Sequence, residues 1–344
     1  MSDIVRTLIQ KITGNIPYDE QDMRQAFSAI MSGDVSPALI SAFLIALKMR
    51  GETPLDITAG AATLRAMADK ITAPDGAIDI VGTGGDGIGT FNISTATAFV
   101  VAGCGVVVAK HGNRAVSSKS GAADVLTSVG VNLDAPFPVL EEALDKAGVC
   151  FLMAPRHHSA MRHVGPIRAE LGTRTIFNLL GPLSNPALVE RVMIGVYDRM
   201  WCRPFAEALQ ALGTTNAWVV HGHDGLDEVT TTTSTSVAAL ANGTITEFDI
   251  HPADYGIATA SLDDLKGGDG VENAKSMRAL LEGDKAASSA YRDIVLMNAA
   301  ASLVGTGHAD DFATALERAQ TSLSSGAALQ ALNSLVDITN APQT

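Results

Sequence analysis

Residues 78–95 read IDIVGTGGDGIGTFNIST, and this stretch decides the fold. Its first four residues form a short, mostly apolar run that predicts a buried strand, and five glycines follow among the eight residues 82–89. A helix is expected next, over residues 95–102. Glycines free backbone N–H groups to approach a bulky anion, and the N-terminus of the following helix adds partial positive charge. We therefore interpret the glycine-rich turn as a phosphate-binding loop.

This loop has weaker interpretations as well. Gly82, Gly84 and Gly87 match G-x-G-x-x-G, but the match alone is a weak sign of a dinucleotide site. The hydroxyl-rich residues 92–95 are not a dinucleotide feature, and no Walker lysine follows. A tight turn with Ser94 as an ordinary helix N-cap is the structural alternative, and the density of glycines favours a functional loop over it.

The alternation of strand and helix continues along the chain and defines the fold class. It predicts βαβ units, and therefore a mainly parallel sheet covered on both faces. The expected strands are 78–81, 106–109, 149–153, 192–196 and 217–220, and the expected helices are 95–102, 122–128, 139–146 and 204–212.

The first seventy residues predict helices only. One helix start is marked by Thr53 and Asp56, which have the spacing of a capping box. We therefore expect an α/β protein with a small all-helical domain at residues 1–72, joined by helices from about 166–185. The larger α/β domain, with its mainly parallel central sheet, should comprise residues 73–344.

Composition limits the possible functions. The chain has 344 residues, of which 47% are apolar, and its net charge of −13 argues against a broad surface for DNA or RNA. Three widely spaced cysteines argue against a disulfide framework and favour a reducing compartment. The N-terminus lacks the pattern of a signal peptide, and no apolar stretch approaches the roughly 18 residues of a membrane span. We expect a cytoplasmic protein with neither nucleic-acid nor membrane partners.

A cationic and polar segment, KHGNRAVSSK at residues 110–119, follows the second expected strand. Lys110 and Arg114 supply positive charge, and Asn113 with the two serines supplies neutral donors, a set that suits a phosphorylated sugar. Because ligands bind at the carboxyl ends of parallel strands, we expect this segment to lie beside the phosphate loop. Taken alone, a solvated polar turn explains it about as well.

A third cluster, HGHDGLDE at residues 221–228, ends the last expected strand. Asp227 and Glu228 are hard oxygen ligands that suit Mg²⁺, which prefers one or two carboxylates together with substrate phosphates. His221 and His223 could indicate zinc, but no H-E-x-x-H motif or cysteine pair supports it. A plain Asp-Gly turn with solvated acids is the structural alternative.

Residues 155–168, with Arg174 just beyond, form a local cationic patch in an acidic protein. The stretch holds three arginines and three histidines, and it could receive a carboxylate or a diphosphate, one arginine binding in a bidentate manner. The alternative is that some of these residues, Arg174 above all, form structural ion pairs between the domains.

Four ordered segments resemble the signature of the anthranilate phosphoribosyltransferase family. The resemblance covers nearly the whole chain, and four long segments in order are more specific than any single glycine motif. They are GTGGDGIGTFNIST at 82–95, KHGNRAVSSKSGAADVL at 110–126, HHSAMRHVGPIRAELGTRTIFNLLGPLSNP at 157–186 and VVHGHDGLDE at 219–228.

The resemblance implies transfer of the phosphoribosyl group of 5-phosphoribosyl 1-diphosphate to anthranilate in tryptophan biosynthesis. It further implies two Mg²⁺ ions per subunit and a homodimer paired through the helical domain. Anthranilate would contact Gly82, Asn113 and Arg168, and the metal ligands would be Ser94, Asp227 and Glu228. Phosphoribosyl diphosphate would contact Gly82, Gly85, Asp86, Thr90, Asn92, Ile93, Ser94, Thr95, Lys110, His111, Gly112, Asn113, Arg114, Ala115, Val116, Ser117, Ser118 and Ala122.

One position departs from the family pattern. Where the family often has Gly-Ser-Ala-Asp, this chain has Ala122 in place of the serine, so a side-chain hydroxyl contact is lost there. The expected chemistry needs no covalent or general-base residue, because the amine of anthranilate is neutral at pH 7. Stabilisation of the departing diphosphate should supply most of the rate.

Three rival interpretations remain at this level. A pyrimidine nucleoside phosphorylase would also cleave a sugar C1 bond, but its lysine-rich phosphate loop is not seen here. A non-catalytic relative that binds nucleic acid would need a basic surface. A scaffold with a decayed site would be expected to have lost some of the motif residues, which are present.

Overall fold

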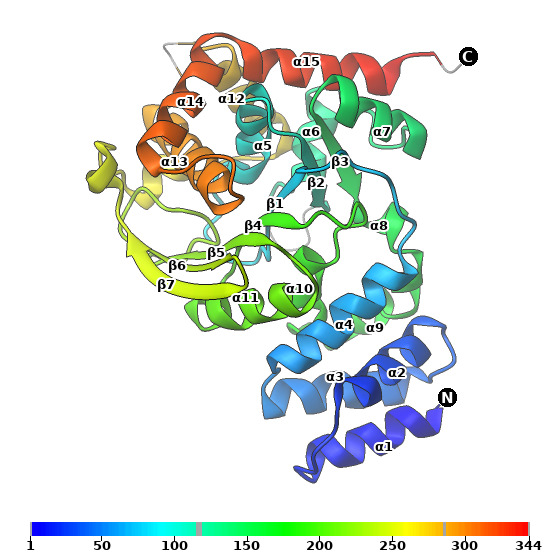
Figure 1. The fold of residues 1–344 in the computed structure, drawn as a ribbon. Coiled ribbons are helices and arrows are strands. Elements are labelled where there is room, and N and C mark those ends of the chain that lie inside the picture. The colour runs from blue at the N-terminus through cyan, green and yellow to red at the C-terminus, as the bar shows by residue number, and fades with distance from the viewer. Residues whose placement is uncertain (1, 115–118, 285–286, 343–344) are drawn as a thin grey trace.

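Short apolar runs that end at glycines form the centre of the molecule, a seven-stranded sheet (Figure 1). The computed structural model describes residues 2–114, 119–284 and 287–342. The strand order is β3-β2-β1-β4-β5-β6-β7, with the first five strands mutually parallel and the last two antiparallel. The prediction of a mainly parallel sheet is confirmed. The strands are β1(Ile78–Gly82), β2(Val108–Gly112), β3(Val149–Met153), β4(Arg191–Gly195), β5(Asn216–Gly222), β6(Thr235–Ala241) and β7(Thr244–Ile250).

Strands β6 and β7 are missing from the sequence prediction. Six of the seven residues of β6 are buried, so its alanine-rich sequence shows no alternation, and β7 is a mostly exposed edge strand. A usable signal was nonetheless present, because Asn-Gly favours the type I′ turn of a two-residue hairpin. Asn242 and Gly243 adopt the left-handed conformations of such a turn, with φ of 51° and 70°.

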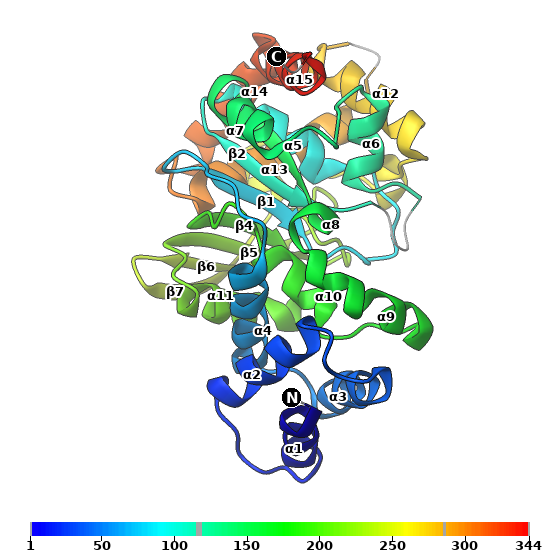
Figure 2. The same ribbon diagram turned by 90° about the vertical axis from the view of Figure 1, so that its right-hand side faces the viewer.

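The N-terminal segment folds into the helices α1(Ser2–Thr13), α2(Glu20–Met31), α3(Pro37–Arg50) and α4(Pro54–Met67). The predicted capping box is present at the start of α4: the Thr53 side chain accepts from the Asp56 N–H, and the Asp56 carboxylate accepts from the Thr53 N–H at 2.8 Å. Figure 2 shows these helices as a lobe below the sheet, with α9 beside them.

Helices cover both faces of the sheet, as the βαβ pattern predicts. One face packs against α5(Ile93–Gly103), α6(Ala122–Ser128), α7(Phe137–Lys146), α12(Gly270–Leu281), α13(Ser289–Gly305), α14(Phe312–Ser324) and α15(Ala327–Asn340). The other face packs against α11(Cys202–Ala211). The short elements are α8(Ala154–His157), α9(Gly165–Leu171), α10(Phe177–Leu180), η1(Ser159–His163), η2(Gly181–Leu183), η3(Arg199–Trp201), η4(Pro252–Tyr255) and η5(Leu262–Leu265).

Two hydrophobic cores lie on opposite faces of the sheet. The first contains α5 and the C-terminal helices. The second begins under β4 and β5 and continues through Ile176 and Leu180 to Phe27 and Phe43 of the helical lobe. Residues 164–183 therefore join the lobe to the sheet through one continuous apolar core. No helix in the described ranges is both long and apolar enough to cross a membrane.

Candidate active site

Loops from separate elements meet at the carboxyl ends of the strands. The Asp227 carboxylate, after β5, accepts the backbone N–H of Gly84 in the phosphate loop at 2.7 Å. The Glu228 carboxylate accepts the N–H of Ser94, at the start of α5, at 3.2 Å. Lys110 of β2 donates from Nζ to the Ser94 hydroxyl at 3.2 Å. The fold thus brings the predicted metal-binding carboxylates onto the predicted phosphate loop.

The carboxylates in this crevice repel one another. Burial, and then the charge of Asp86, raise the pKa of Asp227 to about 6. Burial, and then the charge of Asp227, raise the pKa of Glu228 to about 8. A bound cation would relieve both effects, because it favours the ionised form of each acid.

The chemistry of these donors fits Mg²⁺. In the described ranges, no three His, Cys, Asp or Glu side chains are placed to hold a metal ion by themselves. Mg²⁺ is commonly bound through one or two carboxylates, with water and substrate phosphates completing its octahedral shell. Asp227 and Glu228, beside a loop suited to phosphate, provide that partial set.

Two glycines make room for Asp227. A Cβ atom at Gly195, where β4 ends, would lie only 1.6 Å from the Asp227 carbonyl oxygen. A Cβ at Gly82 would lie 2.5 Å from Asp227 Oδ2. The chain beyond β5 can cross the ends of β1 and β4 only because both positions lack a side chain.

The Gly195→Ala substitution should therefore displace Asp227. We expect Mn²⁺, used as a spectroscopic substitute for Mg²⁺, to bind roughly 10- to 100-fold more weakly, the usual effect of disturbing the support of a metal ligand. Electron paramagnetic resonance of free Mn²⁺, with phosphoribosyl diphosphate present, measures this. Gly165→Ala is the matched control, because a Cβ there meets no atom within 4 Å. Equal Mn²⁺ affinity in both variants would contradict the argument.

Helix α13 supports the segment that follows the predicted metal ligands Asp227 and Glu228. Asn298, fully buried, accepts the Val229 N–H at 2.9 Å and donates to the Val229 carbonyl at 2.8 Å. Its amide also donates to the Ile294 carbonyl at 2.8 Å. These bonds fix the residue directly after Glu228. Sequence reasoning missed Asn298, because no local pattern distinguishes it from other polar residues on an apolar helix.

The side chains around the start of α5 serve different purposes. Asn92 accepts from Asn273 at 2.8 Å and from the Ser120 hydroxyl at 3.1 Å, so it ties α5 to α12 and to the loop after β2. Ile93 and Thr95 are each only 1% exposed. A ligand could therefore contact their backbone but not their side chains.

The structure differs from the prediction for the segment after the second strand. The expected strand 106–109 actually spans Val108–Gly112, so Lys110 and His111 lie within β2 and are almost fully buried. Asn113 and Arg114 do follow the strand in a loop, where Arg114 pairs with Asp124 at 3.3 Å. Ala122 is the first residue of α6. Ala115, Val116, Ser117 and Ser118, four predicted ligand contacts, lie outside the described residues.

Arg168 on α9 has few partners for a half-buried cation. Its guanidinium lies over the Phe177 ring, 5.7 Å from the centroid, and donates to the Asn178 side chain at a long 3.5 Å. Burial lowers its pKa, but the group remains charged at neutral pH. Most of its five N–H donors therefore have no partner among the described residues and could bind a carboxylate.

Arg174 does not form the ion pair suggested from the sequence; among the described residues no carboxylate lies within salt-bridge distance of it. Its guanidinium stacks on Tyr197, 4.1 Å from the ring centroid, and donates to the carbonyl of Gly85. It still connects the two parts of the molecule, because this bond links the segment after α9 to the phosphate loop.

Three buried histidines lie where β2 meets the segment after β3: His111 belongs to β2, and His157 and His158 belong to that segment. The rings of His111 and His158 are 5.3 Å apart, and His157 stacks on Phe137 and bonds to the Asp69 carbonyl. In each of the three histidines Nε2 is buried without a described hydrogen-bond partner. Burial, then the neighbouring histidines, lower the pKa of His111 to about 3, and the same causes lower that of His158 to about 4.

These histidines should make the fold sensitive to acid. The unfolded chain takes up protons below a pKa near 6.5, whereas folded His158 stays neutral down to about pH 4. The contribution of neutral His158 to the free energy of unfolding is therefore complete above pH 6.5 and falls with the pH. At pH 5 the loss is about 2 kcal/mol, because each pH unit between the two pKa values corresponds to ~1.4 kcal/mol. The buried carboxyls with raised pKa act in the opposite direction, so a comparison with a variant is needed.

Urea unfolding of the wild type and of His158→Gln at pH 7.5 and pH 5 isolates this effect. We expect the free energy of unfolding of the wild type to fall about 2 kcal/mol further than that of the variant over this interval. An equal change in both proteins would contradict the assignment of a neutral, buried His158.

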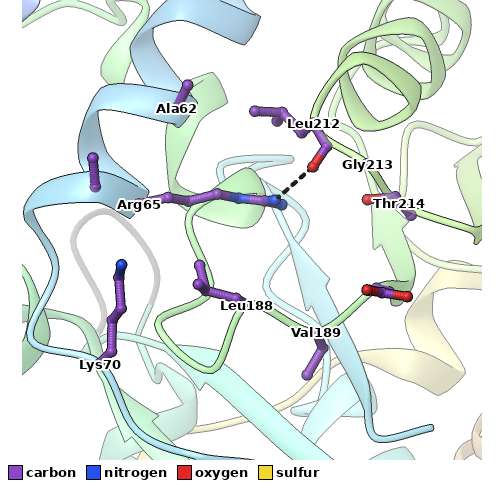
Figure 3. Close-up of a pocket in the computed structure, with 10 residues that line it drawn as sticks. Ala62, Arg65, Lys70, Leu188, Val189, Leu212, Gly213 and Thr214 are labelled. Atoms are coloured by element: carbon purple, nitrogen blue, oxygen red, sulfur yellow. Dashed lines mark hydrogen bonds between the residues drawn. The ribbon is translucent and has the colours of Figure 1, made fainter. Parts of the chain in front are cut away.

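A cavity of about 380 Å³ lies at the opposite end of the strands from the candidate site, near the amino ends of β4 and β5 (Figure 3). Arg65 of α4 enters it, but its guanidinium donates to the carbonyls of Leu183 at 2.6 Å and Leu212 at 3.5 Å. These carbonyls stand at the ends of η2 and α11, where a cation is favoured. Arg65 therefore serves as a structural tie between the helical lobe and the sheet.

Comparison with known proteins agrees with this geometry. The profile of the glycosyl transferase family α/β domain matches residues 74–329, and that of the family's helical bundle domain matches residues 6–68. The anthranilate phosphoribosyltransferase of Rhodospirillum rubrum is 55% identical over 338 residues, covering 98% of this chain and 96% of the relative.

Solved structures give the same result. The crystal structure of the enzyme of that name from Thermus thermophilus has a TM-score of 0.91 and 40% identity, covering 97% of this chain and 99% of the other. The Saccharomyces cerevisiae enzyme, solved in complex with PRPP and Mg, has a TM-score of 0.90 and 28% identity, with 98% of both chains covered. The resemblance seen in the sequence is confirmed, and the chain belongs to the anthranilate phosphoribosyltransferase family.

Proposed function

We propose that this chain transfers the phosphoribosyl group of 5-phosphoribosyl 1-diphosphate to the amine of anthranilate, releasing diphosphate. One observation carries the proposal: Asp227 and Glu228 are hydrogen-bonded to backbone N–H groups of the phosphate loop and of the helix that follows it. This arrangement brings a cation-binding pair and an anion-binding loop into one crevice, which is what a metal-bound diphosphate requires.

The phosphoribosyl diphosphate would lie across the carboxyl ends of β1 and β2. Its phosphates would contact Gly82, Gly85 and the start of α5, with charge from Lys110 and Arg114. Thr90, Asn92 and the backbone of Ile93 and Thr95 would border the same ligand. These roles rest on the bonds that bring the segment after β5, the start of α5 and β2 together at Ser94.

Mg²⁺ would be held by Ser94, Asp227 and Glu228, and we propose two ions per subunit. When bound, the ions would neutralise the charge that develops on the leaving diphosphate. The chain's own part is to hold the two substrates in line. Arg168 would bind the anthranilate carboxylate, and Gly82 and Asn113 would border the ring. No side chain has to remove a proton before the neutral amine attacks.

The direct test is a fluorescence assay. Purified protein is mixed with anthranilate, phosphoribosyl diphosphate and Mg²⁺, and anthranilate fluorescence is followed with EDTA as the control. A loss of fluorescence that EDTA abolishes supports the proposal. No loss with folded protein would contradict the choice of acceptor, and phosphorolysis of thymidine or uridine would then be assayed in its place.

We also propose a cytoplasmic homodimer and a division into a helical domain, residues 1–72 with about 166–185, and an α/β domain, residues 73–344. Ile16 and Met49 of the helical lobe are 54% and 83% exposed, and we propose that the partner subunit covers them. The three cysteines carry free thiols, as expected in a reducing compartment. Light scattering should give twice the 35.6 kDa mass of the chain.

A further inference from the structure

The hydrogen-bonded ladder between β1 and β2 is unusually short. Strand β1 pairs with β4 at five successive positions, and β2 pairs with β3 at five, but β1 and β2 pair only at Ile78 and Val108. The pair begins regularly, since the Ile78 N–H donates to the Val107 carbonyl at 2.9 Å. Beyond this point the ladder between β1 and β2 stops before their carboxyl ends, where the phosphate loop and residues 112–114 begin.

The geometry of a regular parallel ladder shows which backbone groups of β1 and β2 have lost their ladder partners. In a regular continuation, the Ile80 N–H would donate to the Ala109 carbonyl, and the His111 N–H would donate to the Ile80 carbonyl. Buried backbone groups must find other partners, because an unpaired one costs about as much as a lost hydrogen bond.

Three side chains supply those partners. The Asp79 carboxylate accepts the His111 N–H at 3.0 Å, Asn185 donates to the Ala109 carbonyl at 2.8 Å, and Lys110 Nζ donates to the Ile80 carbonyl. Asn185 also donates to Asp79 Oδ2 at 2.8 Å. Asp79 is fully buried and Asn185 is 3% exposed. Side chains therefore take the place of the missing ladder bonds for the His111 N–H, the Ala109 carbonyl and the Ile80 carbonyl.

The short ladder has a consequence for the site. Lys110 links the unpaired part of β1 to the start of α5, since the same Nζ that bonds to the Ile80 carbonyl also donates to the Ser94 hydroxyl. Asn185 is itself fixed by its own loop, because its Oδ1 accepts the Ala187 N–H at 2.8 Å. The wedge formed by Asp79 and Asn185 is thus anchored between β1, β2 and the loop that leads into β4.

We infer that Asp79 and Asn185 are positioning residues that hold the carboxyl ends of β1 and β2 in this unpaired arrangement, so that the phosphate loop, Lys110 and residues 112–114 can surround phosphoribosyl diphosphate. The inference rests on the proposed function, which places that ligand at the ends of these two strands. Neither residue has to touch the ligand; each acts through the strand that it holds.

Two single variants and one donor–acceptor exchange test the wedge, which is the pair Asp79 and Asn185. Asp79→Asn keeps the shape but sets an amide donor against the Asn185 donor, and Asn185→Ser removes the bonds to both Asp79 and Ala109. Calorimetry with Mg²⁺ and phosphoribosyl diphosphate, without anthranilate, should show at least tenfold weaker binding for each. In Asp79→Asn with Asn185→Asp the donor and acceptor between the two side chains are exchanged, so binding should be weakened by less than the product of the effects of Asp79→Asn and of Asn185→Asp, each measured alone.

The control is Val149→Ala on β3, which destabilises the same sheet without touching the wedge. The affinity of Val149→Ala for Mg²⁺ and phosphoribosyl diphosphate should stay within about twofold of the wild type. In the wedge variants, the anthranilate KM should change far less than the phosphoribosyl diphosphate KM. Should one wedge variant not fold, the other carries the test. Wild-type affinity in a folded wedge variant overturns the inference, whereas a wild type that does not bind overturns the proposed function.

Discussion

The double variant Asp227→Asn, Glu228→Gln is expected to lose at least ~10³-fold in kcat/KM, and to leave almost no Mg²⁺-dependent reaction. The reason is electrostatic. Metal stabilisation of a developing phosphate charge supplies several kcal/mol, and each ~1.4 kcal/mol corresponds to a tenfold rate. The neutral amides can still accept the N–H groups of Gly84 and Ser94, so the fold of the crevice should be retained.

Asp224→Asn is the matched control for this variant. Asp224 lies in the same loop, but its carboxylate accepts from the hydroxyls of Thr230 and Thr232 rather than from the phosphate loop. Its activity, followed by anthranilate fluorescence over a Mg²⁺ titration, should remain within a few-fold of the wild type. Comparable losses in both proteins would mean that the whole loop, rather than a metal site, had been disturbed.

The second large effect is expected for Arg168→Ala, which should lower kcat/KM for anthranilate by ~10- to 150-fold and leave the phosphoribosyl diphosphate KM nearly unchanged. A hydrogen bond to a charged group contributes about 1.5–3 kcal/mol, which converts to that range. Arg168 is suited to this role because its only described hydrogen bond, to Asn178, is long.

Two further variants sharpen the test of Arg168. Arg168→Lys should recover only part of the activity, since an ammonium group keeps the charge but not the bidentate fork. Arg162→Ala removes an exposed arginine from the same cationic patch and should leave the anthranilate KM unchanged. An unchanged anthranilate KM in Arg168→Ala would disprove the assignment, and equal effects at Arg162 and Arg168 would indicate general attraction by the patch.

Much of the fold and of the candidate site could be predicted because the signals are local. Glycines after a strand, Thr53 with Asp56 at a helix start, and adjacent carboxylates at Asp227 and Glu228 are each read within a few residues. The errors have local causes as well. Lys110 and His111 read as loop because polar residues in a strand are unusual, and the buried β6 shows no alternation.

The sequence by itself determined the fold class and predicted the phosphate loop and the residues that would hold a metal, because hydrophobic periodicity and residue chemistry are properties of short segments. Only the tertiary structure decided which of these groups meet. Asp227 bonds to Gly84 across 143 positions of chain, Asn298 holds Val229 across 69, and Asn185 reaches Asp79 across 106. Such pairings depend on the order of strands in the sheet, which brings distant segments to one edge, and no local pattern in the sequence encodes that order.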